Sequence, residues 1–401
     1  MDVKNVFLNG ELTEEVYMKP PPRYDHPPKK VCRLRKTLYG LKQAPRKWFA
    51  KFSYTICNLG FKSSSYDHAL FLRKTDQGCT LLLLYVDDMI ITGDDTNGIR
   101  DLKNFLHQQF EMKDLGQLSY FLGLEIASEK SGYYLSQAKY ATDLISRAGI
   151  TDTKVVSTPF DSTEHLAATD GTPLSDEILY RQLVSSLIYL TVTRPDIAYV
   201  VHIVSQFTSS PRTTHFFVVL RIFRYIRGTL FHGLHFDHSS PLELLAYSDV
   251  DWASDPTDRR STTGYCFFLG TSLISWRSKK QTVVSRSSTE SEYRAFVDTT
   301  SELLWIQWLL QDTDVPSSVA IPLFCDNNSA MHIAHNDVFH ERTKHIEIDC
   351  HLTRYHVVNG TIQLILISSQ AQIVDIFTKF HPPQRFQDLV SNLKMFNALP
   401  L

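Results

Sequence analysis

Two adjacent carboxylates lie between two apolar runs in the stretch LLLLYVDDMIITG, residues 81–93. Asp87 and Asp88 fall at the turn of a predicted hairpin, so both side chains can project from one edge of a sheet. Two unit charges 4 Å apart repel by about 1 kcal/mol in water and by roughly 4 kcal/mol at an effective dielectric of 20. A divalent cation removes this cost, and Mg²⁺ prefers carboxylate oxygens. The pair is therefore a candidate metal site, whereas Asp94 and Asp95, between glycines in TGDDTNG, are interpreted as an ordinary turn.

A second set of acids lies in the C-terminal part of the chain. Asp249 follows the apolar run LELLAYS, and Glu292 falls early in a long predicted helix. Asp326 follows the apolar run IPLFC, and Asp375 begins a helix in QAQIVDIFTK. Acids at the ends of two strands and near the starts of two helices can converge at one edge of a sheet. Four such carboxylates could bind two metal ions.

Alternatives stay open at three of these positions. Asp251 lies two residues after Asp249 and would share its strand face, but Asp249 comes directly off the apolar run and is preferred. Glu290 competes with Glu292, because an acid in the first helical turn can be a capping residue. Asp375 could be a simple charge at a helix start.

Cysteine and histidine do not form a recognisable metal site. The six cysteines are scattered and never form C-x-x-C, which indicates reduced intracellular thiols. The spacing of five histidines fits no ligand pattern, so they are interpreted as surface residues, with His345 able to assist near the second acidic set; they are His332, His335, His340, His345 and His351.

Basic residues are unevenly placed, although the net charge is only −2. Residues 29–51 hold nine Lys or Arg and no acid, with Tyr39 and Trp48 between them. This pattern suits a phosphate backbone and stacked bases, and the alternative is a solvated helix face. The stretch RSKK at 277–280 would similarly suit the backbone of a hybrid duplex, or form a solvated turn.

The elements that must position these residues follow from hydrophobic periodicity. We predict helices at 36–60, 98–110, 137–148, 178–228 and 288–312. The first is broken near Pro45 and the fourth at TRPD, residues 193–196. Two further helices are predicted between the last two strands, and others at the C-terminal end. We predict strands on both sides of Asp87 and Asp88 and at 119–127, 132–136, 242–248, 263–269, 273–280, 321–325 and 361–367, with a linker at 161–177. Strands followed by alternating helix and strand predict an α/β domain with a mixed sheet at the C-terminal end.

The bulk composition sets the class of protein. A chain of 401 residues with 43% hydrophobic and 21% charged residues is typical of a soluble protein of two or three domains. No apolar run reaches the roughly 18 residues that a membrane span needs, and the N-terminus does not resemble a signal peptide. These features predict an intracellular protein of the cytoplasm or nucleus, with no membrane partner.

Several strings resemble the Pol polyproteins of copia-type (Pseudoviridae) LTR retrotransposons, over essentially the whole chain. YVDD is similar to the metal-binding hairpin of reverse transcriptases, and MDVKNVFLNG to the strand that carries their remaining catalytic aspartate. LYGLKQAPRKW at 38–48 is similar to their template- and nucleotide-contacting segment. LSYFLGLEI, YRQLVSSLIYLTVTRPDIAY and VFHERTKHIEID resemble copia-type elements in particular, and the C-terminal acids resemble those of the ribonuclease H (RNase H) fold.

This resemblance implies a function and a set of roles. It implies an RNA-directed DNA polymerase with an RNase H that degrades RNA in RNA–DNA hybrids, both using Mg²⁺, or Mn²⁺ in its place, in a two-metal mechanism. The implied metal-binding and catalytic residues are Asp2, Asp87, Asp88, Asp249, Glu292, Asp326 and Asp375. Phe7 would be the steric gate against a ribose 2′-OH, and the implied substrate-binding residues are Phe7, Gly40, Lys42, Arg46 and Lys47. The implied partners are an RNA template, a DNA primer, an RNA–DNA hybrid, dNTPs, and other Pol or Gag products.

The implied fold is an α+β palm of the reverse transcriptase type without its fingers, a helical thumb or connection region, and an α/β RNase H-like domain. The expected bounds are 1–135 for the palm, 136–240 for the thumb and connection, 242–380 for the RNase H-like domain and 381–401 for a helical tail. We expect the 242–380 region to fold by itself. Reverse transcriptases carry a fingers region ahead of the strand that contains Asp2, so we expect impaired polymerase activity from this chain alone. The alternative function is a non-catalytic remnant of a retroelement that binds nucleic acid.

Overall fold

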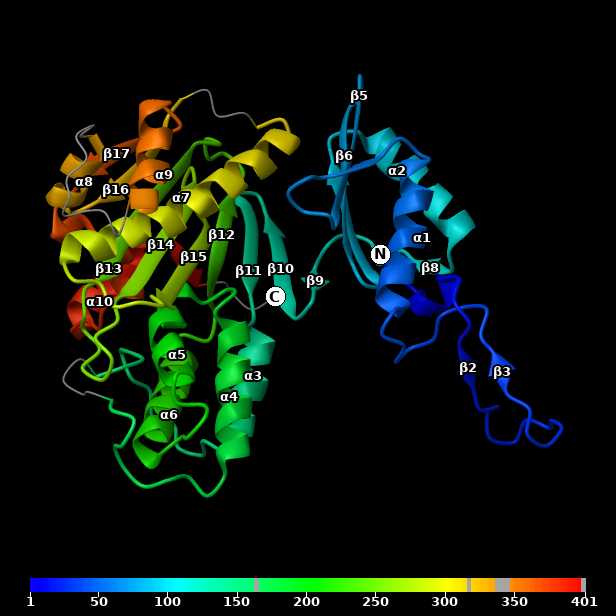
Figure 1. Ribbon diagram of the computed structural model, residues 1–401, viewed down its shortest axis with the longest axis horizontal. Helices are drawn as coiled ribbons and strands as arrows, with labels where there is room; N and C mark the ends of the chain where they lie inside the picture. Colours follow the sequence, from blue (N-terminus) through cyan, green and yellow to red (C-terminus); the bar gives the residue numbers. More distant parts are fainter. Residues whose placement is uncertain (162–165, 316–318, 336–346, 398–401) are drawn as a thin grey trace. The chain divides into compact units, whose positions relative to one another are not determined.

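The computed structural model describes residues 1–161, 166–315, 319–335 and 347–397 (Figure 1). The chain forms two compact units. The first contains Met1–Leu118 together with Trp308–Val315, and the second contains Ser119–Gln307 together with Pro316–Leu401.

The first unit is built on a six-stranded sheet in the order β4-β5-β6-β7-β1-β8. Side chains from this sheet and from two helices share one apolar core that includes Trp48, Phe52, Phe71 and Leu102. The elements of this unit are β1 (Asp2–Val3), η1 (Val6–Asn9), β2 (Tyr17–Met18), β3 (Cys32–Arg33), α1 (Ala44–Cys57), β4 (Lys62–Ser63), β5 (Leu70–Thr75), β6 (Gly78–Tyr85), β7 (Asp88–Gly93), α2 (Thr96–Gln109) and β8 (Met112–Lys113).

The hairpin predicted around the paired aspartates is confirmed. Tyr85 of β6 pairs with Asp88 of β7, so the two-residue turn consists of Val86 and Asp87. The helix expected over 36–60 begins only at Ala44, because proline fits the first turn of a helix and breaks an interior turn.

The second unit contains a five-stranded sheet in the order β15-β14-β13-β16-β17. Its first three strands are antiparallel, whereas β16 runs parallel to β13 and β17 runs parallel to β16. The mixed sheet expected at this end of the chain is therefore present, and α7 runs across one face of it (Figure 1). The elements are β13 (Leu244–Asp251), β14 (Thr262–Leu269), β15 (Ser272–Lys280), α7 (Ser288–Asp312), β16 (Ile321–Cys325), α8 (Asn328–His335), α9 (Glu347–Val358), β17 (Ile362–Leu366), η4 (Ser369–Ala371), η5 (Ile373–Phe377) and α10 (Pro383–Asn392).

The second unit contains another five-stranded sheet, in the order β18-β12-β11-β10-β9. Its strands come from segments that we expected in different domains. The strands between 120 and 136, which we expected in the palm, pair here with a strand formed by 232–237. The tail beyond 381 adds the last strand, so it is neither separate nor purely helical. The elements are β9 (Tyr120–Phe121), β10 (Leu124–Glu129), β11 (Gly132–Ser136), α3 (Ala138–Arg147), α4 (Glu177–Leu190), η2 (Pro195–Ile197), α5 (Ala198–Ser205), α6 (Thr213–Gly228), β12 (His232–Asp237) and β18 (Met395–Asn397).

One apolar core runs through the helical region and the mixed sheet of the second unit. It joins Leu187 of α4 and Ile222 of α6 to Phe268 of β14, Phe377 of η5 and Leu389 of α10. The boundary expected between 240 and 242 therefore cuts through a continuous core, which argues against independent folding of residues 242–380. Of the linker predicted at 161–177, residues 162–165 lie outside the described part of the chain.

Candidate metal centres

The mixed sheet brings three of the predicted acids to one edge. Asp249 lies near the carboxyl end of β13, and Asp326 is the first residue after the neighbouring β16. Because β13 and β16 are parallel neighbours, their carboxyl ends lie at the same edge of the sheet. Glu292 lies in the first turns of α7, the helix that runs across one face of the sheet (Figure 1).

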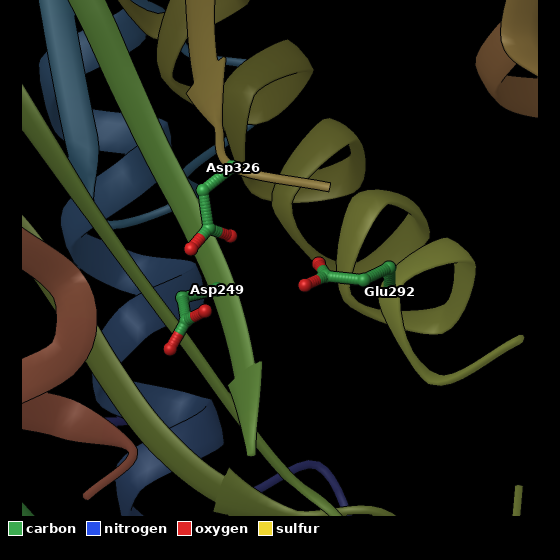
Figure 2. A group of neighbouring side chains, drawn as sticks. All are labelled: Asp249, Glu292 and Asp326. Atoms are coloured by element: carbon green, nitrogen blue, oxygen red, sulfur yellow. The ribbon is translucent and has the colours of Figure 1, made fainter. Parts of the chain in front are cut away.

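Figure 2 shows the carboxyl groups of Asp249, Glu292 and Asp326 turned toward one another. One oxygen from each residue lies within 4.8 Å of the other two, and among the described residues this is the only acidic, histidine or cysteine group of three or more with that geometry. Oxygens that bind one Mg²⁺ at 2.0–2.1 Å in an octahedron lie about 2.9–4.2 Å apart, so a small closure would complete such a site.

The environment of Glu292 supports a role for its carboxylate as a metal ligand. The residue is 4% exposed, and its Oε2 has no hydrogen-bond partner within the described chain. Burial, and then the charges of Asp249 and Asp326, raise the pKa of Glu292 well above its ordinary value. An unpaired buried carboxylate oxygen is costly, so Glu292 is a candidate ligand for a cation.

Asp249 is also held in a costly environment. The residue is 1% exposed, and burial raises its pKa to about 7, against the opposing effect of the Lys379 ammonium. Its Oδ2 accepts a hydrogen bond of 2.5 Å from the Thr378 hydroxyl. Asp326 is less buried, and its Oδ2 accepts a hydrogen bond of 2.7 Å from the Ser369 hydroxyl.

Asp375, the fourth predicted acid, does not join this group. It lies in η5 and is buried, and its oxygens are paired with two cations. Lys379 Nζ lies 2.8 Å from Asp375 Oδ1, and an Arg385 guanidinium nitrogen lies 3.4 Å from Oδ2.

The two competing acids have structural partners of their own. Glu290 caps the start of α7, because its Oε2 accepts from the Arg286 backbone N–H at 2.8 Å and its Oε1 lies 3.0 Å from Arg294. Asp251 is part of β13, but its carboxylate accepts a hydrogen bond from the Ser254 hydroxyl. Neither residue belongs to the group of three.

In the first unit, strand pairing places Asp2 beside the hairpin. Asp2 of β1 lies directly opposite Asp88 of β7, and residues opposite each other in an antiparallel pair project from the same face. Burial, and then the charges of Asp87 and Asp2, raise the pKa of Asp88. The turn is fixed by the Trp48 indole, which donates to the backbone carbonyl of Val86 at 2.8 Å. Three carboxylates thus lie at one end of this sheet.

The predicted substrate-binding residues surround α1 and the segment before it. The ring of Phe7 is half-buried and meets Tyr39 edge-on, with 4.7 Å between ring centroids. Gly40 has a φ of +90°, a conformation that favours glycine. Lys42 and Arg46 are exposed on the surface of this segment.

Other predicted cations are already paired. Lys47 Nζ lies 3.1 Å from Glu14, and Lys280 of the RSKK stretch binds Asp255 and lies 3.0 Å from Asp258. These ion pairs leave Lys47 and Lys280 less available for phosphate contacts than the sequence suggested.

The histidines do not form a metal site in the described part of the chain, where His332, His335 and His351 are exposed. His340 and His345, with most of the VFHERTKHIEID segment, lie outside the described residues.

Known proteins match the chain along its whole length. Residues 1–162 match the family model described as reverse transcriptase (RNA-dependent DNA polymerase). The retrovirus-related Pol polyprotein from transposon RE1 of Arabidopsis thaliana is 41% identical over 402 residues, which cover 100% of this chain and 27% of that protein. The Pol polyprotein from transposon TNT 1-94 of Nicotiana tabacum is 38% identical over 399 residues, which cover 96% of this chain and 30% of that protein. A transposon Ty5-1 protein of Saccharomyces cerevisiae is 33% identical over 308 residues, which cover 76% of this chain and 100% of that protein.

The chain belongs to the copia-type family of retrotransposon Pol polyproteins. It contains a reverse transcriptase domain, and it spans less than a third of the length of the two plant polyproteins that it matches. None of the helices described in this copia-type chain combines the length and apolar character needed to cross a bilayer.

Sequence reasoning missed the partners of the acids. Thr378 and Lys379 contact Asp249, and Ser369 contacts Asp326, yet none was singled out. For Lys379 a signal was available, because it lies four residues after Asp375, the spacing at which side chains meet on a helical turn. Ser369 and Thr378 carry no comparable local signal.

Proposed function

We propose that the second unit of this chain hydrolyses the RNA strand of RNA–DNA hybrids at the centre formed by Asp249, Glu292 and Asp326. The observation that carries the proposal is the buried, unpartnered Glu292 oxygen beside two further carboxylates. Hydrolysis of a phosphodiester needs a cation that neutralises charge developing on the phosphate, and this centre offers hard oxygen ligands for Mg²⁺ or Mn²⁺.

The chain's own residues have distinct tasks in this proposal. The three carboxylates would hold the metal ion, which when bound supplies an activated water and stabilises the phosphate's negative charge. The Thr378 hydroxyl and the Ser369 hydroxyl orient Asp249 and Asp326, because each donates to one carboxylate oxygen and leaves the other free. The rigid sheet edge keeps the three oxygens together before substrate binds.

For the first unit we propose RNA-directed DNA polymerisation at Asp2, Asp87 and Asp88, with an RNA template, a DNA primer and dNTPs as substrates. Membership of the family and the pairing of Asp2 with Asp88 support it. The implied roles of Phe7, Gly40, Lys42, Arg46 and Lys47 in substrate binding belong to this proposal, and so does a second metal ion at this centre. The reduced polymerase activity expected of this chain alone stays a prediction.

A matched pair of variants tests the RNase H proposal in the full chain. Asp249→Asn removes one ligand charge, and Asp251→Asn makes the same change two residues along the same strand, outside the group of three. Loss of a residue that only orients a metal ligand costs 10–100-fold, so loss of a ligand should lower hybrid cleavage by more than about 100-fold. The Asp251 variant should retain most of the cleavage.

The outcomes separate the proposal from its alternative. If the folded wild-type chain cleaves no hybrid with either Mg²⁺ or Mn²⁺ but binds it, the chain is a non-catalytic nucleic-acid-binding remnant. Equal losses in the two variants would contradict the assignment to the group of three, because Asp251 lies outside it. Primer extension by the same chain, compared with that of Asp88→Asn, tests the polymerase half separately.

A further inference from the structure

A lysine ammonium lies between two acids beside the metal centre of the second unit. Lys379 Nζ is 3.3 Å from Asp249 Oδ2 and 2.8 Å from Asp375 Oδ1. Both acids are buried, whereas the lysine side chain is 40% exposed. The Lys379 ammonium thus pairs with Asp249, which belongs to the group of three, and with Asp375, which does not.

The backbone that carries this lysine is fixed. On one side of Lys379, Thr378 is fully buried and hydrogen-bonded to Asp249. On the other side, the ring of Phe380 stacks on that of Phe160, with 3.6 Å between the ring centroids. Helix η5 and the residue that follows it pack so closely on β14 that a Cβ on Gly264 would lie 2.7 Å from a methyl group of Thr378. Gly264 is the partner of Asp249 in the sheet, so the lysine is positioned by the same strands as the acid.

An ion that bound both Asp249 Oδ2 and Asp375 Oδ1 would lie about 2.1 Å from each oxygen. The ammonium nitrogen already lies 3.3 Å and 2.8 Å from these atoms, so it fills the space that such an ion and its waters would need. Two cations also repel strongly at this range. The ammonium and a divalent ion therefore compete for the space between these two acids.

The other side of the centre is open to an ion. In the described chain, neither Glu292 nor Asp326 makes an ion pair with a lysine or arginine, and the Oε2 of Glu292 is unpartnered. The three carboxylates can therefore offer oxygen ligands to one cation. The oxygens of Asp375, in contrast, are already paired with Lys379 and Arg385.

We propose that Lys379 takes the place of a second divalent ion: Asp249, Glu292 and Asp326 bind one ion, and the Lys379 ammonium supplies the positive charge between Asp249 and Asp375. The proposal rests on the metal centre of the proposed function, and it replaces the two ions that the family resemblance implies there with one. Lys379 is a positioning residue here, because it holds two acids and no reacting atom.

The number of bound ions can be measured without activity, by electron paramagnetic resonance of the full chain titrated with Mn²⁺. All variants carry Asp88→Asn, which disables the acidic site of the first unit. With Lys379 present we expect one tightly bound Mn²⁺ and no magnetic coupling. Lys379→Met should bind two, with the dipolar broadening of ions about 3.5–4 Å apart.

Three controls keep the measurement interpretable. Lys379→Arg retains a cation and should bind one ion, and Arg385→Met removes the other cation on Asp375 and should also bind one. Glu292→Gln should lose the single ion. Circular dichroism checks folding, and Lys379→Gln, which keeps a polar side chain, replaces Lys379→Met if the latter does not fold.

The outcomes are decisive. A coupled pair of ions with Lys379 present, or a single ion in folded Lys379→Met, overturns the assignment of Lys379. No Mn²⁺ binding at all overturns both this proposal and the metal centre. One ion with Lys379, two without it and no cleavage of a hybrid would uphold the assignment while the proposed hydrolysis fails.

Discussion

Replacing Asp249 with asparagine should stabilise the second unit when no divalent metal is present. The carboxyl group of Asp249 is buried, and its pKa of about 7 lies well above the ordinary 3.8, despite the nearby Lys379. At 1.36 kcal/mol per pKa unit, this difference corresponds to roughly 4 kcal/mol of destabilisation by the ionised form. Asparagine resembles the neutral acid in size and polarity, so it removes this cost.

The pH dependence has a definite sign. The pKa is raised in the folded state, so the folded state holds the proton more tightly than the unfolded state, and stability falls as the pH rises from about 4 to 7. Above pH 7 both states are ionised and the cost is constant. The advantage of Asp249→Asn over the wild type should be roughly 4 kcal/mol at pH 8 and about 2 kcal/mol at pH 5.

Hydrogen exchange localises this measurement within the full chain. Peptides that cover β13 and β14 report the free energy of opening this sheet, independently of the first unit. Exchange would be followed in EDTA at pH 8 and pH 5 for the wild type, Asp249→Asn and Asp326→Asn. Asp326 is less buried, so its variant should change stability less.

Metal reverses the order of stability. Excess Mg²⁺ binds the folded wild type and raises its protection, but should protect Asp249→Asn far less. If Asp249→Asn is as stable as the wild type, or less stable, at pH 8 without metal, the argument from burial and charge is wrong.

Three further predictions concern the architecture of the second unit. Arg194 and Asp196 form a fully buried ion pair at 2.6 Å, so Arg194→Met should lower the free energy of unfolding by about 3–5 kcal/mol. Adding Asp196→Leu should restore much of this free energy, because no buried charge is then left unpaired. An equal loss of stability in the double variant would contradict the argument. Gly264→Ala should cost about 1–3 kcal/mol in urea unfolding, because the new methyl group would lie 2.7 Å from an atom of the segment packed on it; an unchanged midpoint would refute this. A fragment of residues 242–380 should lack a cooperative unfolding transition and dispersed NMR signals, whereas one of residues 119–401 should show both, because only the longer one contains the continuous core.

The sequence determined the local elements and the identity of the acids. The strand at 321–325 and the helix at 288–312 have the predicted bounds, because hydrophobic periodicity and flanking turns are local properties. The hairpin that carries Asp87 and Asp88 was predictable for the same reason. The motifs also implied the family, which the comparisons confirm.

Pairing between distant segments was not predictable in the same way. The short strands at 232–237 and 395–397 pair with each other, and 232–237 also pairs with 132–136, although neither short strand has a strong period of its own. Such strands form because a neighbouring edge supplies hydrogen-bond partners, and this depends on the tertiary structure. This pairing joins segments on both sides of the expected domain bounds.

The side-chain environment was likewise decided in three dimensions. From the sequence, TRPD indicated only a helix break at Pro195, whereas folding buries its arginine and aspartate as a pair beneath Tyr225. Glu290 and Glu292 have similar local sequence contexts but face different directions from α7. Glu290 therefore caps the helix start, whereas Glu292 keeps an oxygen without a hydrogen-bond partner among the described residues. Sequence alone thus specified which acids this protein has and which elements carry them. Only the tertiary structure decided which acids meet and which are neutralised, because burial and charge pairing depend on residues brought together from distant parts of the chain.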